Sequence, residues 1–293
     1  MDIRFLESFV AVTDCGSIAE AARRLGLTPA ALAQRLRALE QDIGHSLVTR
    51  VGRTVRPTAS GLAILRKARA LIGDAHDLKA IAANGQPAGQ LRLGATASSL
   101  TGLLPDIVLR LNAAYPLIEY FVRPGSSADL YDGVVAGELD AAFIVRPHFP
   151  IPKSTGWLML REEPQVLIAP EGLALDDPHA AIERHPFIRY DRNQWGGQIV
   201  ERYLRQHGLK VREWLELDAL DAIAALVNRG LGIAIVPDWA PPWPEGLRLQ
   251  KQLLPGGGVR QTGILWGRSG ARIAATRALV DVCGEVAARP RQP

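Results

Sequence analysis

The sequence predicts two parts of different fold class, a helical N-terminal domain with a short β-hairpin and a larger α/β region behind it. Three observations support this division. Amphipathic helical segments separated by turn signals fill the first 60 residues, and a long helical stretch then ends at residues 84–90, which hold two glycines and a proline. Beyond that segment, apolar strand-like runs alternate with helical patterns. At 293 residues the chain has room for two or three domains.

The first part carries the signals of a helix-turn-helix. Ser17 is followed three residues later by Glu20, which is the spacing of a capping box at a helix start. Gly26 then permits a tight turn, and Thr28 with Pro29 supplies an N-cap hydroxyl and a proline at the first helical position. Two helices joined by a short glycine-containing turn form this motif. An apolar helix over residues 4–14 is expected to pack against the pair.

The second helix of the motif, residues 29–41, has two different faces. Leu32, Leu36 and Leu39 form an apolar stripe, whereas Gln34 and Arg37 lie opposite, where side chains of this type read base edges or hold phosphates. The glycine-containing segment behind the helix is expected to form a short hairpin, or wing. The residues expected to contact DNA are Ser17, Thr28, Pro29, Ala30, Ala33, Gln34, Arg35, Arg37, Arg50, Arg53 and Arg56.

The charge of this region is strongly one-sided. Between Arg23 and Arg69 there are ten Lys or Arg and only two acids, Glu40 and Asp42. The arginines of a balanced, solvated surface would be accompanied by more carboxylates. A basic face beside a helix-turn-helix is the electrostatic footprint of a double-stranded DNA partner. The first 90 residues carry the whole net charge of +4, so the remainder of the chain is neutral.

A long helical stretch, from about residue 58 to 83, follows the wing. It either packs on its own domain or pairs with a second copy, and we favour pairing into a homodimer because it stands between a DNA-binding unit and a flexible segment. Its apolar stripe comprises Leu62, Leu65, Ile72, Ala75, Leu78 and Ile81. The expected domains are therefore 1–60 for DNA, 61–88 as linker helix and hinge, and 89–293 as a separate α/β domain.

The C-terminal region alternates strands and helices, which implies parallel or mixed sheets covered on both faces. It could hold one large sheet or two smaller ones. Strands are expected at 91–94, 118–123, 141–145, 165–169, 187–190, 214–217, 232–236 and 263–266. Helices are expected at 103–114, 129–136, 198–207, 220–229 and 271–288.

The N-terminal run FLESFVAVTDCGSIAEAARRLGLTPAALAQRLRALEQDIGHSLVTR, continuing to RPTASG, resembles the LysR-type transcriptional regulators. The resemblance extends more loosely over LRLGATAS, LLPDIV, GELDAAFIV and ALVNRGLGIAIVP. Two positions depart from the family pattern: Ala33 stands where a serine is frequent, and Val48 where phenylalanine is usual. The matching positions are Phe9, Gly16, Ser17, Ala21, Ala22, Leu25, Leu39, Glu40, Gly44, Leu47, Arg50, Thr58 and Gly61.

The resemblance implies a fold and a set of partners. The C-terminal half would be two small α/β subdomains joined by two crossing strands, similar to periplasmic solute-binding proteins. One would hold about residues 91–161 and 266–293, and the other about 162–265. An effector would bind between them and alter how the chain binds its operator. The family usually forms tetramers from two dimers, and RNA polymerase is a further candidate partner.

Candidate effector contacts lie where predicted strands end, because open α/β units bind ligands there. Arg123 and Arg146 favour an anionic effector, unless acids such as Asp129 neutralise them. Trp195 is either a wall for an aromatic ligand or part of a core. The residues expected to contact the effector are Thr96, Ala97, Ser98, Ser99, Arg123, Gly125, Ser126, Arg146, Asn193 and Trp195.

We expect no catalytic site, no metal and no cofactor. The six histidines lack ligand spacing, and no nucleophile elbow or phosphate loop is visible. Cys15 and Cys283 are expected to be structural, with a redox role left open. We also expect no membrane span and a cytoplasmic location. The alternatives are a small-molecule-binding protein or enzyme with an incidental N-terminal domain, and a purely architectural nucleic-acid protein.

Overall fold

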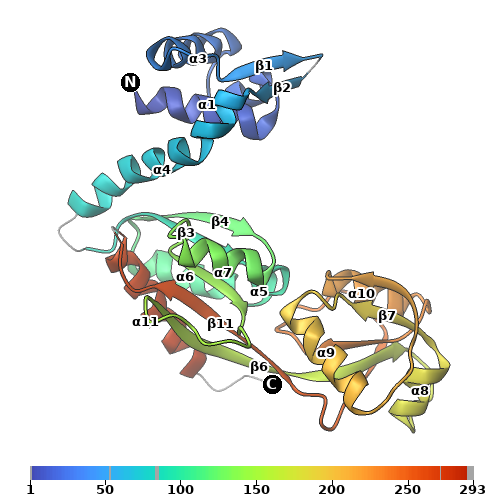
Figure 1. Cartoon of the computed structure of the whole chain (residues 1–293). Coiled ribbons are helices and arrows are strands. Elements are labelled where there is room, and N and C mark those ends of the chain that lie inside the picture. The colour runs from blue at the N-terminus through green and yellow to red at the C-terminus, as the bar shows by residue number, and fades with distance from the viewer. Residues whose placement is uncertain (1, 53, 83–85, 271, 289–293) are drawn as a thin grey trace. The chain divides into compact units, whose positions relative to one another are not determined.

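The computed structural model describes residues 2–52, 54–82, 86–270 and 272–288, which form two compact units, 1–84 and 85–293 (Figure 1). The elements of the N-terminal unit are α1 (Ile3–Cys15), α2 (Ile18–Arg24), α3 (Pro29–Ile43), β1 (Val48–Val51), β2 (Thr54–Pro57) and α4 (Ala59–Ala82). Among the described residues, no helix is long and apolar enough to cross a membrane.

The starts of the helices follow the capping residues that the sequence displays. The Ser17 side chain accepts a hydrogen bond from the backbone N–H of Glu20 at the start of α2, and Thr28 Oγ1 accepts one from Ala31 at the start of α3. Gly44 ends α3 in the left-handed conformation, with φ +78°. Buried residues from α1, α2 and α3, including Phe9, form one core.

The α4 helix divides its apolar residues between two environments. Ala68 is buried in the core of the N-terminal unit, and Leu65 and Ile72 pack against that core. Leu62 and Leu78 are instead 60% and 64% exposed. The expected apolar stripe is therefore not a single exposed surface, because its central residues pack within their own unit. The Ile81 side chain lies outside the described part of the structure.

The C-terminal unit contains a mixed seven-stranded sheet in the order β10-β6-β11-β5-β3-β4, with β9 also pairing with β6. The strand β6 has 16 residues and is shared by two groups of strands, one built around β3, β4 and β5, the other around β9 and β10. The elements of the C-terminal unit up to residue 170 are β3 (Gly89–Ala95), α5 (Ala97–Gly102), α6 (Leu104–Ala114), β4 (Ile118–Pro124), α7 (Ser127–Val135), β5 (Ala141–Val145) and β6 (Thr155–Pro170).

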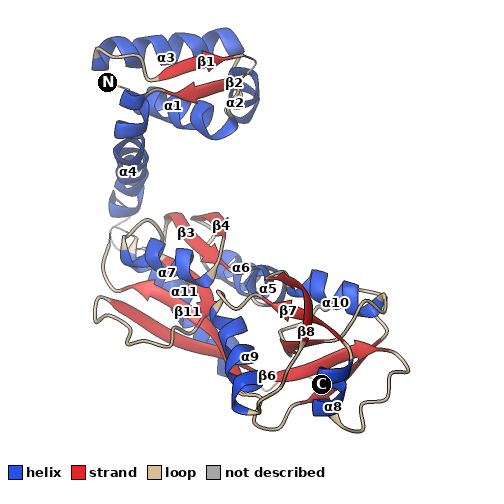
Figure 2. Ribbon diagram, turned by 45° about the vertical axis from the view of Figure 1, so that its right-hand side comes forward, coloured by secondary structure: helices blue, strands red, loops and turns tan. Residues whose placement is uncertain are grey.

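The first group of strands is covered on both faces, as Figure 2 shows. Phe143 of β5 belongs to the core that contains α6 and α11, whereas its neighbour Ile144 belongs to the core that contains α7. Adjacent strand residues point to opposite faces, so a wholly apolar strand such as β5 must be covered twice. We call residues 86–161 and 262–288 lobe I.

Residues 162–261 form lobe II, which has a separate core from its own helices and strands. Lobe II also contains the two-stranded parallel sheet β7-β8. In this sheet Phe187 forms a β-bridge with Ile233, the residue just before β9. The remaining elements of the whole C-terminal unit, of which α11 belongs to lobe I, are α8 (Pro178–Arg184), β7 (Pro186–Tyr190), α9 (Trp195–Gln206), β8 (Arg212–Leu217), α10 (Leu220–Asn228), β9 (Ala234–Pro237), β10 (Leu249–Leu253), β11 (Val259–Gly267) and α11 (Ile273–Ala288).

Two long antiparallel strands, β6 and β11, run from one lobe into the other. Their register shifts between Thr262 and Gly263, and an irregularity of this kind bends a strand and increases its twist. The sequence predicts only short strands here, at 165–169 and 263–266. The first half of β6 is not predicted as a strand because Pro164 and the charged residues before it interrupt the apolar pattern. Proline and clustered charge are unusual inside a strand.

Candidate functional site

The outer face of α3 is the first candidate site. Thr28, Pro29, Ala30, Gln34 and Arg37 are exposed, while Ala33 and Arg35 are half-buried. This pattern follows from the opposite stripe of α3, where leucines pack into the core. The Ser17 and Thr28 hydroxyls are engaged as helix caps.

A carboxylate fixes α3 to the wing. Glu40 Oε1 accepts hydrogen bonds from the backbone N–H groups of Leu47, at 2.7 Å, and Val48, at 3.3 Å. The Glu40 carboxylate therefore anchors the start of the wing to α3. A Cβ on Gly61 would overlap the Leu47 carbonyl oxygen, so α4 approaches this loop closely enough to require glycine.

The wing is the antiparallel hairpin β1-β2. Arg56 lies opposite Thr49, and Arg50 lies opposite Val55. Directly opposed residues share a face and successive residues alternate, so Arg50 and Arg56 point to opposite faces of the hairpin. Both are exposed, and Arg50 Nε donates to the Gly52 carbonyl oxygen. Arg53 lies outside the described residues.

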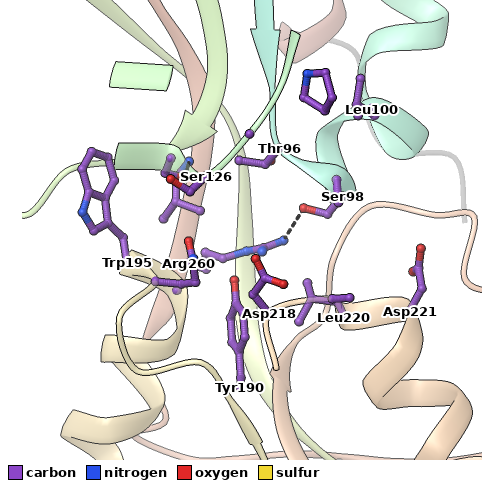
Figure 3. Close-up of a pocket in the computed structure, with 18 residues that line it drawn as sticks. Thr96, Ser98, Leu100, Ser126, Tyr190, Trp195, Asp218, Leu220, Asp221 and Arg260 are labelled. Atoms are coloured by element: carbon purple, nitrogen blue, oxygen red, sulfur yellow. Dashed lines mark hydrogen bonds between the residues drawn. The ribbon is translucent and has the colours of Figure 1, made fainter. Parts of the chain in front are cut away.

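The second candidate site is a pocket of about 330 Å³ between lobes I and II. Lobe I supplies the starts of α5 and α7, and lobe II supplies the starts of α9 and α10 (Figure 3). Strands end and helices begin here, which is where open α/β units place ligands. The residues that line it are Thr96, Ala97, Ser98, Leu100, Pro124, Gly125, Ser126, Ser127, Val145, Tyr190, Gln194, Trp195, Gly196, Asp218, Ala219, Leu220, Asp221 and Arg260.

Arg260 of β11 is the basic residue of this pocket, and it is only 2% exposed. It lies directly opposite Glu163 of β6, and its Nε donates to Glu163 Oε2 at 2.6 Å. Its Nη2 donates to Ser98 Oγ of lobe I at 3.2 Å. Burial disfavours the guanidinium charge, but the interactions with Glu163 and Tyr190 together outweigh it and raise the Arg260 pKa.

Tyr190 forms the floor of the pocket beside Arg260, as Figure 3 shows. Burial raises the pKa of its hydroxyl, so the phenol is neutral and able to donate. A Cβ on Gly196 would lie 2.7 Å from the Tyr190 hydroxyl oxygen. The glycines at the start of α9 therefore allow the helix to approach the tyrosine, although the sequence predicts this helix only from residue 198.

The structure brings together some of the expected effector contacts and separates others. Thr96, Ala97, Ser98, Gly125, Ser126 and Trp195 line the pocket. Ser99 does not, because its buried hydroxyl bonds to Thr96 Oγ1. Tyr190 ends the strand expected at 187–190, where ligand contacts are expected, although it is not among the expected contact residues, and Arg260 is not expected at the pocket at all. The strand expected at 263–266 begins three residues too late to include Arg260, and no motif marks it.

The two arginines that favour an anionic effector are not in the pocket. Arg123 donates to Glu138 at 3.3 Å and to the Asp129 carbonyl oxygen, so it is used within lobe I. Arg146 donates to Gln261 Oε1 at 2.9 Å. Asn193 also lies outside, bonded to Asp191. These three expectations are corrected, because each side chain bonds to a residue that does not line the pocket, namely Glu138, Gln261 or Asp191.

Trp195 fits both roles that the sequence leaves open, a wall of the ligand pocket and part of a packed core. It lines the pocket from the first turn of α9 in lobe II. It also packs edge-to-face against Tyr131 and Phe149 of lobe I, with ring centroids 5.9 and 5.6 Å apart. One rim of the pocket is thus an aromatic contact between the lobes.

The chain combines an N-terminal unit that has an exposed helix and a wing with a two-lobed unit that has a pocket between its lobes. This combination is typical of ligand-responsive transcriptional regulators. Comparison with known families agrees with this architecture. Residues 3–62 match the bacterial regulatory helix-turn-helix protein, lysR family, and residues 84–288 match the LysR substrate binding domain. The chain belongs to the LysR-type family of transcriptional regulators, as the sequence resemblance predicts.

Individual relatives span nearly the whole chain. It is 30% identical to the HTH-type transcriptional regulator IlvR of Caulobacter vibrioides over 280 residues, covering 92% of this chain and 94% of that protein. It is 27% identical to the activator IlvY of Salmonella typhimurium, covering 81% and 83%. The crystal structure of the LysR family regulator CbnR is similar in fold, with a TM-score of 0.70, 20% identity and coverage of 99% and 100%.

Proposed function

We propose that this regulator binds operator DNA through residues 1–60, pairs through the linker helix at 61–88, and binds a small effector within residues 89–293. The full-length structure of CbnR with its target DNA, which has a TM-score of 0.68 to this chain, supports a DNA partner. Acting on bacterial DNA, the protein would work in the cytoplasm. It would act by binding alone, without turnover of its effector.

Sequence preference would come from α3 and general affinity from the basic residues around it. Gln34 and Arg37 are exposed long side chains on the outer face of α3, and such side chains hydrogen-bond adenine and guanine in the major groove. Arg56 on the wing suits a phosphate contact, because phosphate contacts supply affinity without sequence information. Ser17 and Thr28 would contribute mainly by starting their helices.

Dimerisation would use the part of the linker helix that its own unit leaves exposed. Leu62 and Leu78 are both more than half exposed, and their sequence separation at about 100° per residue places them on different sides of the helix, so each would meet the partner chain in a separate contact. A dimer would present two α3 helices to two half-sites of an operator.

The observation that carries the effector proposal is a pocket lined by both lobes and spanned by the bond from Arg260 to Ser98. A ligand in this position contacts both lobes together, so its affinity depends on how the lobes are arranged. An effector that binds two arrangements differently shifts the balance between them.

Selection of binding sites from a random duplex library by the full-length protein tests the DNA proposal. The expected result is enrichment of one palindromic site with two half-sites. Recovery of unrelated sequences, with binding that depends on salt alone, would instead indicate an architectural protein.

A further inference from the structure

The pocket between the lobes carries an unbalanced negative charge on one wall. Its charged lining residues are Arg260, Asp218 and Asp221. Arg260 is paired with Glu163, which is equally buried at 2% exposed and accepts its Nε hydrogen bond, and Arg161 Nε lies 3.7 Å from the other oxygen of the same carboxylate. The two aspartates are the charged side chains of the pocket lining that are not engaged in such a pair.

The two carboxylates are free to receive a ligand. Asp218 and Asp221 are exposed, and neither makes a hydrogen bond or ion pair within the described part of the chain. Asp218 lies just before α10, directly beneath Arg260 in Figure 3, and Asp221 lies in the first turn of that helix. An anionic ligand enclosed here would be repelled by both carboxylates and would displace their water without replacing it.

The opposite wall, from lobe I, carries hydroxyl groups. Ser98 accepts its hydrogen bond from Arg260, so its own proton can be donated into the pocket. Thr96 and Ser126 line the same wall. One wall thus offers donors and the other offers carboxylates, so a matching ligand has a hydrogen-bond acceptor at one end and a cationic group at the other.

We propose that the effector is a small amine-bearing molecule whose protonated nitrogen is held by Asp218, with Asp221 adding to the negative potential, and whose acceptor group meets Ser98. This assignment rests on the proposed effector pocket and specifies its ligand. An α-amino acid is one small molecule with both groups. The Asp218 contact would be a charge-assisted hydrogen bond that water does not supply as well once the lobes enclose the ligand.

Thermal shift and calorimetry on the full-length protein test this assignment. The probes are the twenty common amino acids, short diamines, and carboxylic acids of the same carbon skeletons without the amine. Amine-bearing probes are expected to bind and their amine-free counterparts to bind more weakly. Asp218→Asn should weaken the best amine probe by about ten- to a hundredfold, which is the value of a hydrogen bond to a charged group.

Asp176→Asn is the matched control, because Asp176 is an exposed aspartate of lobe II outside the pocket, and it should change nothing. Asp218→Glu keeps the charge and should retain part of the affinity. Equal binding of amine-free acids, unchanged affinity in Asp218→Asn, or no binding by any amine probe would overturn the assignment. If amine-free acids bind and alter operator affinity, the effector pocket stands while the amine assignment fails.

Discussion

Arg260 Nη2 of lobe II donates a hydrogen bond to Ser98 Oγ of lobe I at 3.2 Å, although the two residues are 162 positions apart in sequence. The same guanidinium is paired with Glu163 on the neighbouring strand. Because Glu163 Oε1 also accepts from the Ala240 backbone at 3.1 Å, one buried pair connects the pocket, both crossing strands and lobe II.

Removing one partner of this pair should strongly destabilise the C-terminal unit. Glu163→Gln leaves a buried arginine without its counter-charge, and the expected loss is about 3–5 kcal/mol of unfolding free energy. The double variant Arg260→Met with Glu163→Leu should recover most of the loss, since apolar replacement of a whole buried pair is often neutral. All six tryptophans lie in this unit, so tryptophan fluorescence during urea unfolding reports on it selectively. A single variant as stable as the wild type would show that the pair contributes little.

Gln34→Ala and Arg37→Ala should each reduce affinity for the selected operator by about 1–3 kcal/mol, the value of a base contact, and should relax its sequence preference. Arg56→Ala should weaken all duplexes similarly and lower the salt dependence, as loss of a phosphate contact does. Fluorescence anisotropy over a salt series measures both quantities. Arg277→Ala is the control, because Arg277 is exposed on α11 in the other unit. Unaltered specificity in the α3 variants would remove α3 as the reading helix.

Lysine substitutions along α4 should separate pairing from folding. Leu62→Lys and Leu78→Lys replace exposed leucines, so the chain should fold but show a smaller mass by light scattering. Leu65→Lys and Ile72→Lys should instead destabilise the N-terminal unit, because these residues pack on its core. An oligomer that survives the exposed substitutions would place the pairing surface elsewhere.

The sequence predicts the fold class, the family and most helices and strands in their order, because capping residues and apolar periodicity are local signals, whereas α5, α8 and β10 have no counterpart among the expected elements. It does not predict which side chains meet. Arg123 and Arg146 are expected at the pocket because each lies at the end of a predicted strand, but Glu138 and Gln261, which do not line the pocket, accept their hydrogen bonds. Arg260 depends on the register of β6 and β11, a pairing of distant segments that no local pattern reveals.

The start of α9 illustrates the same limit. The sequence predicts this helix from Gln198, because the two glycines before it are typical of a turn. In the structure the helix begins at Trp195, and Gly196 is needed for close approach to Tyr190. The preference for a turn is overridden by packing between α9 and β7, so Trp195 enters the rim of the pocket.

The two cysteines should differ in reactivity. Burial raises the pKa of the Cys283 thiol to about 12, so it stays protonated at neutral pH, and the thiolate is the reactive form. Cys15 is half-buried on α1. A colorimetric thiol reagent at neutral pH should therefore find one thiol in the native protein and two in denaturant. Fast reaction of both native thiols would contradict a structural role for Cys283.

The central claim is that one ligand in the pocket between the lobes controls DNA binding. The most direct measurement is calorimetric titration of the amine probe with the largest thermal shift into the full-length protein, alone and saturated with its selected operator. Linkage requires the operator to change ligand affinity by the same factor as the ligand changes operator affinity, typically about five- to 150-fold. We predict such a change in the wild type and its loss, together with ligand affinity, in Ser98→Ala. Identical ligand affinity with and without operator would contradict the account.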